Sequence, residues 1–88
     1  MYLHLGQGVV VPETDIIGVF DLDNTTGSKI TRKFLSDAEK AGQIFSVSNE
    51  LPDSFVVLSE RKTNKMKIYL SQLSSQTLLK RSGTMRFE

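Results

Sequence analysis

Two carboxylates follow an apolar run in the first third of the chain, in the string VFDLDNT at residues 19–25. Carboxylates at the end of a buried strand can hold a hard cation such as Mg²⁺ and can attack phosphorus. Phosphoryl transfer by Asp21 and Asp23 is therefore one hypothesis. The other interpretation makes Asp21 an exposed strand residue and places Asp23 and Asn24 in a turn, where short polar side chains are common.

The string resembles the first motif of the haloacid-dehalogenase-like phosphotransferases, in which one Asp is the nucleophile and the next acts as acid and base. Those enzymes have a much larger domain, with a later lysine and a further acidic pair on separate strand ends. Only about 60 residues follow the motif here, and the remaining acids form no such pair. We therefore favour strand and turn roles, and we expect no catalytic residue, no metal site and no cofactor.

His4 is the only histidine in the chain, and cysteine is absent. No serine or metal-ligating partner stands at a recognisable spacing from His4, and a polar residue on an edge strand needs no function. The absence of cysteine also excludes disulfides and thiolate chemistry.

Cations gather at one predicted hairpin tip: Arg61, Lys62, Lys65 and Lys67 occupy four of seven positions, offset by Glu60. Such side chains can contact phosphates without reading base sequence. Basic turns also serve as solubility features and protect sheet edges, so the pattern alone is a weak signal.

A second basic group, Lys29, Arg32 and Lys33, stands in the first turns of a predicted helix, with Asp37 and Glu39 later. This order is the reverse of what the helix dipole favours, at a cost of roughly 0.3 to 1 kcal/mol per charge. A negatively charged partner and a merely solvated helix face explain it about equally well.

The composition is that of an ordinary globular chain. Of 88 residues, 39% are hydrophobic and 24% charged, and the net charge is +1, so any nucleic-acid role must depend on local patches. The start of the chain lacks the pattern of a signal peptide, and no stretch has the length of a membrane span. We expect one domain, residues 1–88, in the cytoplasm.

Near the start, β-prone runs at residues 2–5 and 9–11 flank Gly6-Gln7-Gly8, whose glycines tolerate the positive φ of a hairpin turn. Residues 15–22 are apolar on both faces, which is typical of a central strand. Gly18 in that run indicates a close backbone approach or a bulge.

A helix is predicted from Ser28, a suitable N-cap, to Gly42, which suits the left-handed position after a helix. The stripe expected to face the sheet consists of Ile30, Phe34, Ala38 and Ala41. A shorter helix is predicted for residues 75–80, with Leu78 and Leu79 packed on the domain, Gly83 as its stop and residues 84–88 as a frayed tail.

Further strands are predicted at residues 44–47, 54–59 and 66–70, joined by a loop over 48–53 and a hairpin tip over 61–65. In the last strand, Met66, Ile68 and Leu70 should face one way and the residues between them the other. The fold class is therefore α+β: a small, mostly antiparallel sheet with one main helix packed on it and a short C-terminal helix.

Over nearly its full length the chain resembles the extracellular matrix regulatory proteins, a family of small bacterial regulators, and it is most similar to their B branch. The matching stretches are MYLHLGQGVVVP, DIIGVFDLDNTTGSKITRKFL, FVVLSE and KIYLSQLSSQTLLKR. The resemblance implies a compact α+β domain, ring-like homo-oligomers, and activation of biofilm-matrix genes through arginines that bind DNA around the ring. In a ring, a modest patch on each subunit becomes a strong site.

One departure from the family matters. The other branch has arginines in the loop before the penultimate strand, where this chain has Glu50, Leu51, Pro52 and Asp53, and a further basic position falls near Asp15. Either this branch uses other cations or it does not bind DNA directly. The candidate DNA-binding residues are Lys29, Arg32, Lys33, Arg61, Lys62, Lys65 and Lys67.

Three functions are compared. The leading hypothesis is a non-enzymatic, oligomeric regulator that contacts the phosphate backbone of double-stranded DNA, with no membrane partner and no small-molecule substrate. The alternative is an oligomeric interaction or structural subunit that does not bind DNA. The remote alternative is the Mg²⁺-dependent phosphotransferase with Asp21 and Asp23.

Overall fold

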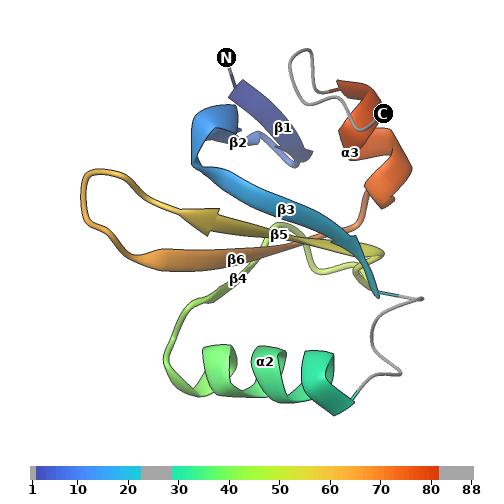
Figure 1. Ribbon diagram of the computed structural model, residues 1–88. Helices are drawn as coiled ribbons and strands as arrows, with labels where there is room; N and C mark the ends of the chain where they lie inside the picture. The colour runs from blue at the N-terminus through green and yellow to red at the C-terminus, as the bar shows by residue number, and fades with distance from the viewer. Residues whose placement is uncertain (1, 23–28, 82–88) are drawn as a thin grey trace.

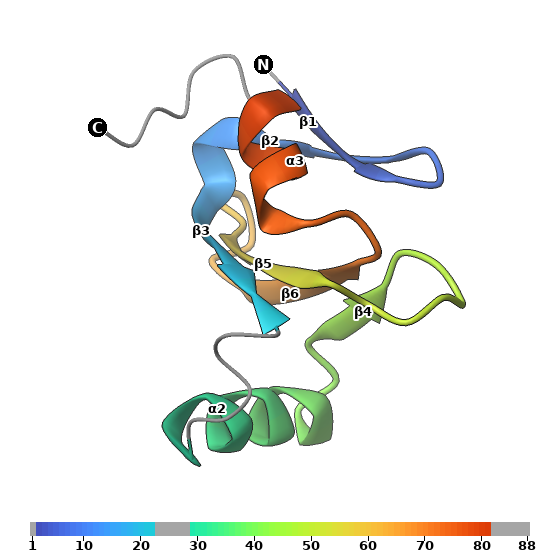
Figure 2. The same ribbon diagram turned by 90° about the vertical axis from the view of Figure 1, so that its right-hand side faces the viewer.

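The computed structural model describes residues 2–22 and 29–81, which form three layers (Figure 1). A four-stranded sheet lies in the middle, helix α2 covers one face, and a β-hairpin with helix α3 covers the other (Figures 1 and 2). The predicted α+β class, with a small and mostly antiparallel sheet, is confirmed.

The first two strands, β1 (Tyr2–Gly6) and β2 (Val9–Pro12), form the predicted antiparallel hairpin. Its turn has positive φ at Gly6 (108°), Gln7 (51°) and Gly8 (78°), which explains why glycine stands on both sides of Gln7. Alternation along the strands buries Leu3, Leu5 and Val11 against the sheet and leaves His4 exposed.

The main sheet contains β3 (Ile16–Asp21), β4 (Ile44–Ser46), β5 (Ser54–Ser59) and β6 (Met66–Ser71) in the order β3-β5-β6-β4. The β3–β5 and β5–β6 pairs are antiparallel, and the β4–β6 pair is parallel. In β5, residues 54–58 are all buried, because α2 lies over one face of this inner strand and the hairpin with α3 over the other.

The prediction of a central strand at residues 15–22 is wrong, because β3 is an edge strand. A short 3₁₀ turn, η1 (Glu13–Asp15), precedes β3. The pairing register of β3 with β5 shifts between Ile16 and Gly18, and Ile17 at this bulge is 63% exposed. The apolar run therefore reflects a bulge and an open edge as well as burial.

The bulge predicted at Gly18 is present as the register shift between Ile16 and Gly18, and the glycine also leaves room for a nearby side chain. A Cβ atom at this position would lie 2.7 Å from the ring of Phe20. That ring stacks on Phe55 of β5 with centroids 5.1 Å apart, so the aromatic pair covers the bare backbone of the glycine.

Helix α2 (Lys29–Lys40) packs Phe34, Leu35 and Ala38 on the sheet. Gly42 has a φ of 72°, which confirms its predicted role after the helix. Ile30, at 82% exposure, and Ala41, also exposed, are not part of the packed stripe, so that part of the prediction is wrong. Ile30 stands in the first turn of α2, and Ala41 follows its last residue, Lys40, whereas the packed residues belong to the middle turns. Ser28, the predicted N-cap, lies outside the described residues.

Helix α3 (Ser75–Arg81) begins after Ser74, whose Oγ accepts a hydrogen bond from the backbone N–H of Thr77 at 3.1 Å. Leu78 is fully buried and Leu79 half-buried, as predicted. Gly83 and residues 84–88 lie outside the described part of the chain.

The sheet separates two apolar clusters. The cluster under the hairpin and α3 includes Leu3, Leu5, Val56, Leu58 and Leu78, and the cluster under α2 includes Ala38, Phe55, Val57 and Ile68. The β6 alternation is confirmed, because Met66, Ile68 and Leu70 belong to the α2 side and Tyr69 to the other.

Candidate nucleic-acid interface

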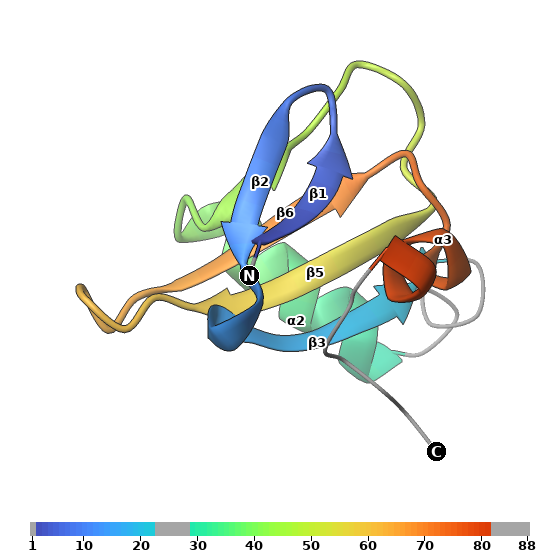
Figure 3. The ribbon, with the colours of Figure 1, turned by 90° about the horizontal axis from the view of Figure 1, so that it is seen from above.

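The connection between β5 and β6 projects from the sheet as a narrow hairpin tip (Figures 1 and 3). The backbone N–H of Glu60 donates to the carbonyl of Lys65 at 2.9 Å, and that of Asn64 donates to the carbonyl of Glu60 at 2.7 Å. Asn64 adopts a left-handed φ of 56°, which asparagine tolerates better than most residues. These bonds hold Arg61, Lys62 and Lys65 on an ordered turn, and all three are exposed.

Two ion pairs reduce the charge of the tip. The ammonium of Lys67 lies 3.1 Å from Oε1 of Glu60, and Nε of Arg61 lies 3.9 Å from Oδ1 of Asp15. The hydrogen bond from Lys67 is the main cause of a lowered pKa at the Glu60 carboxyl, so the pair persists to lower pH than an ordinary glutamate would allow. Lys62 and Lys65 have no ion-pair partner among residues 2–22 and 29–81.

The helix cations form a separate group. Lys29, Arg32 and Lys33 are exposed on the first turns of α2, and Lys33 is paired with Asp37 at 3.3 Å. These turns lie at the end of α2 away from the hairpin tip (Figures 1 and 3). The structure therefore does not bring the seven candidate residues into one patch: Arg61, Lys62, Lys65 and Lys67 form one group, and Lys29, Arg32 and Lys33 form the other.

The acidic loop over residues 47–53 stands at the opposite end of β5 from the tip (Figure 3). Leu51 in this loop is 90% exposed. At the base of the loop, the backbone N–H of Asp53 donates to the carbonyl of Ser71 in β6, and the N–H of Leu22, directly after β3, donates to the carbonyl of Asp53. The acidic loop and the hairpin tip are thus different places on the fold (Figure 3).

Two residues that contact the tip group, Asp15 and Phe45, were not among the candidates predicted from the sequence. Asp15 meets Arg61 only because η1 turns the chain toward the tip, and their separation of 46 positions gives no local signal. Phe45, on the outermost strand β4, lies beside Lys67, whose ammonium is 5.5 Å from the ring centroid. A single aromatic in a three-residue strand resembles an ordinary core residue in the sequence.

The structure describes only the first part of the string VFDLDNT, residues 19–22. Asp21 ends β3, and Asp23 lies outside the described residues. Where the structure describes side chains, no three from histidine, cysteine, aspartate and glutamate gather as metal ligands would. None of the described helices has the length and apolar character needed to cross a membrane.

The fold and the site define a small three-layer α+β protein with a basic hairpin projecting from its sheet. No family model matches the chain. It is 38% identical over 85 residues to extracellular matrix regulatory protein B of Bacillus subtilis (strain 168), an alignment that covers 97% of this chain and 94% of that protein. The chain therefore belongs to the extracellular matrix regulatory protein family, in the B branch.

Proposed function

We propose that this chain is a non-enzymatic, cytoplasmic regulator of extracellular-matrix genes, which assembles into homo-oligomers and binds double-stranded DNA through its hairpin tip. Two observations support the proposal. Its relative is named an extracellular matrix regulatory protein, and the tip presents Arg61, Lys62 and Lys65 on an ordered, projecting turn. The exposed tip is the observation that carries the DNA contact.

The tip suits the phosphate backbone better than the start of α2 does. A narrow turn can approach a duplex groove edge, and its cations extend from a backbone that two hydrogen bonds hold in place. Each group contains a cation with an ion-pair partner, Lys33 with Asp37 and Arg61 with Asp15, so the projecting turn is what distinguishes the tip. Contacts of this kind carry affinity and little base readout.

The proposal requires binding that depends strongly on salt. The native chain should bind a random-sequence duplex at low ionic strength, with an affinity that falls steeply as salt rises, because each phosphate contact releases a condensed counterion. A fluorescence-anisotropy titration at several salt concentrations measures both. Absence of binding at the lowest salt would overturn DNA binding and favour the alternative, an oligomeric interaction subunit.

Self-association is the second part of the proposal, and the open edge of β3 supports it. Ile17 is exposed at the bulge, and Phe20 is 40% exposed beside it on the same edge strand. An edge strand with exposed apolar side chains favours pairing with another chain. Each chain has a net charge of only +1, but in an oligomer one duplex can contact several tips at once, and the binding of these tips adds up.

Light scattering should give a solution mass that is a multiple of the mass of one chain, and Ile17→Lys should lower it, because a charge on the edge opposes strand pairing. Leu51→Lys is the matched control, since Leu51 is also exposed and lies off the β3 edge. A monomeric native chain would contradict self-association. A lower mass with Leu51→Lys alone would place the contact on the acidic loop instead.

A further inference from the structure

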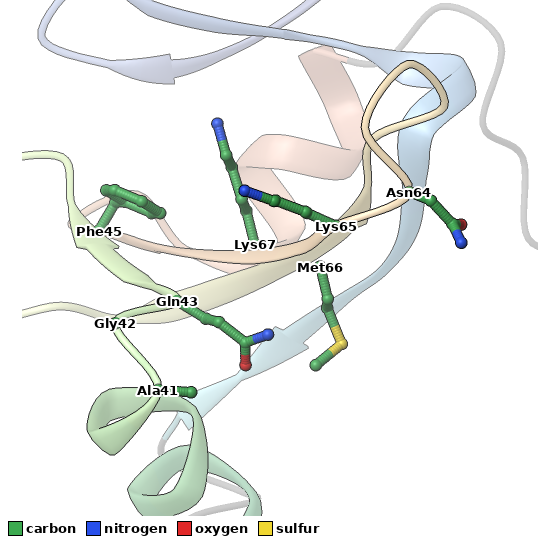
Figure 4. A pocket seen from close by; sticks show the side chains of 8 residues that line it. All are labelled: Ala41, Gly42, Gln43, Phe45, Asn64, Lys65, Met66 and Lys67. Carbon is green, nitrogen blue, oxygen red and sulfur yellow. The ribbon is translucent and has the colours of Figure 1, made fainter.

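A cleft of about 640 Å³ lies beside the hairpin tip (Figure 4). Strand β4 begins opposite Ile68, so it does not pair with the first residues of β6. Residues 41–43 after α2 form one wall, the tip and the start of β6 (Asn64–Lys67) form the other, and Phe45 stands at the end of the cleft. Its volume is within the range of clefts that take small organic ligands.

Phe45 is a half-exposed aromatic ring on the outermost described strand. Two side chains of β6 lie against its ring: Tyr69, with ring centroids 5.5 Å apart, and Lys67, with its ammonium 5.5 Å from the centroid. Phe45 is 40% exposed, and in the described sheet no strand lies on the other side of β4.

The cations of the cleft stand on the same side of β6 as this ring. Figure 4 shows the side chains of Lys65 and Lys67 extending beyond the strand on the Phe45 side. Lys67 is held by Glu60 at 3.1 Å, whereas Lys65 is exposed and has no ion-pair partner among the described residues. An exposed aromatic ring on the same side of β6 as an ammonium without an ion-pair partner matches a ligand that is flat and apolar at one end and anionic at the other.

We propose that this cleft binds an unpaired aromatic base joined to a phosphate, with the base stacked on Phe45 and the phosphate next to Lys65. Every base has a π-face, so stacking on an aromatic side chain tolerates all four bases. The site goes beyond duplex binding, because a base paired inside a duplex has its faces covered by its neighbours. A free nucleotide and a single strand both supply this chemistry.

Oligothymidylate, ATP and a duplex with the same number of phosphates are the three probes, each titrated against the native chain and Phe45→Leu. Phe45→Leu should weaken binding of the single strand by roughly five- to a hundredfold, the range expected when one base no longer stacks on an aromatic ring. Its duplex affinity should stay the same, because Arg61 and Lys62 are untouched. Phe45→Tyr, which keeps an aromatic ring, should retain single-strand binding, and thermal melting confirms that both variants fold.

Changes in the NMR chemical shifts of the Phe45 and Lys65 amides distinguish the two sources of the ligand. Changes on addition of ATP assign a free nucleotide, and changes on addition of oligothymidylate alone assign a single strand. The proposal is overturned if neither oligothymidylate nor ATP binds. It is also overturned if Phe45→Leu lowers the affinity for the ligand that binds no more than it lowers the affinity for the duplex, or leaves both affinities unchanged. Single-strand binding that needs Phe45 without any duplex binding would overturn the proposed duplex function and leave this site standing.

Discussion

Replacing Arg61, Lys62 and Lys65 together with alanine is expected to lower the affinity for duplex DNA by between about tenfold and a hundredfold at low salt. Each of the three cations is exposed and can make a charge-assisted hydrogen bond to a phosphate. A fully formed bond of this kind contributes about 1.5 to 3 kcal/mol to the binding free energy. The slope of log affinity against log salt should also decrease, by about 0.9 for every phosphate that the variant no longer neutralises. Anisotropy titrations at several salt concentrations give both quantities.

The chain offers a matched control for this variant. Lys29, Arg32 and Lys33, replaced together with alanine, remove the same charge and the same residue types, one arginine and two lysines, from the far end of α2. The helix variant should keep most of the duplex affinity if the tip makes the contact. Equal reductions in the two variants would show a response to overall charge, and a larger reduction in the helix variant would move the interface to α2.

Replacing Leu78 with alanine is expected to destabilise the fold by about 2 to 5 kcal/mol. Leu78 is fully buried and joins α3 to the cluster of Leu3, Leu5, Val56 and Leu58, so its removal leaves a cavity between the helix and the sheet. An 88-residue domain has a total stability of only about 5 to 15 kcal/mol. Thermal melting should show a midpoint lower by roughly 10 °C or more.

Gln76→Ala is the control for that variant, because Gln76 is exposed in the same helix and alanine favours helix formation. Its melting midpoint should stay close to the native value. If Leu78→Ala melts at the native temperature, then α3 does not pack on the sheet through this residue.

Much of the fold follows from local patterns that the sequence displays. The glycines around Gln7 specify a tight hairpin turn, and Gly42 specifies the end of α2, because positive φ is costly for other residues. Strict alternation in β6 assigns its two faces without any knowledge of the neighbours. Resemblance along nearly the whole chain also indicated the family, which the 38% identical relative confirms.

Other features depended on which elements meet. An apolar run such as residues 16–22 is compatible with a central strand and with a bulged edge strand, and only the order of strands in the sheet places it at the edge. Likewise, Ile30 fits the helical period of the apolar stripe, but it is 82% exposed on the first turn of α2. Periodicity records which residues share a face and contains no information on how far the opposing surface reaches.

The sequence by itself determined the types of charge, the turns and the family of this protein, because these depend on residue identity and on neighbours along the chain. The tertiary structure alone decided that the seven candidate cations fall into two groups at opposite ends of the molecule. It also brought Asp15 to Arg61 and Phe45 to Lys67. Electrostatic and stacking contacts depend on distance in space, and strand order sets that distance for residues far apart in sequence.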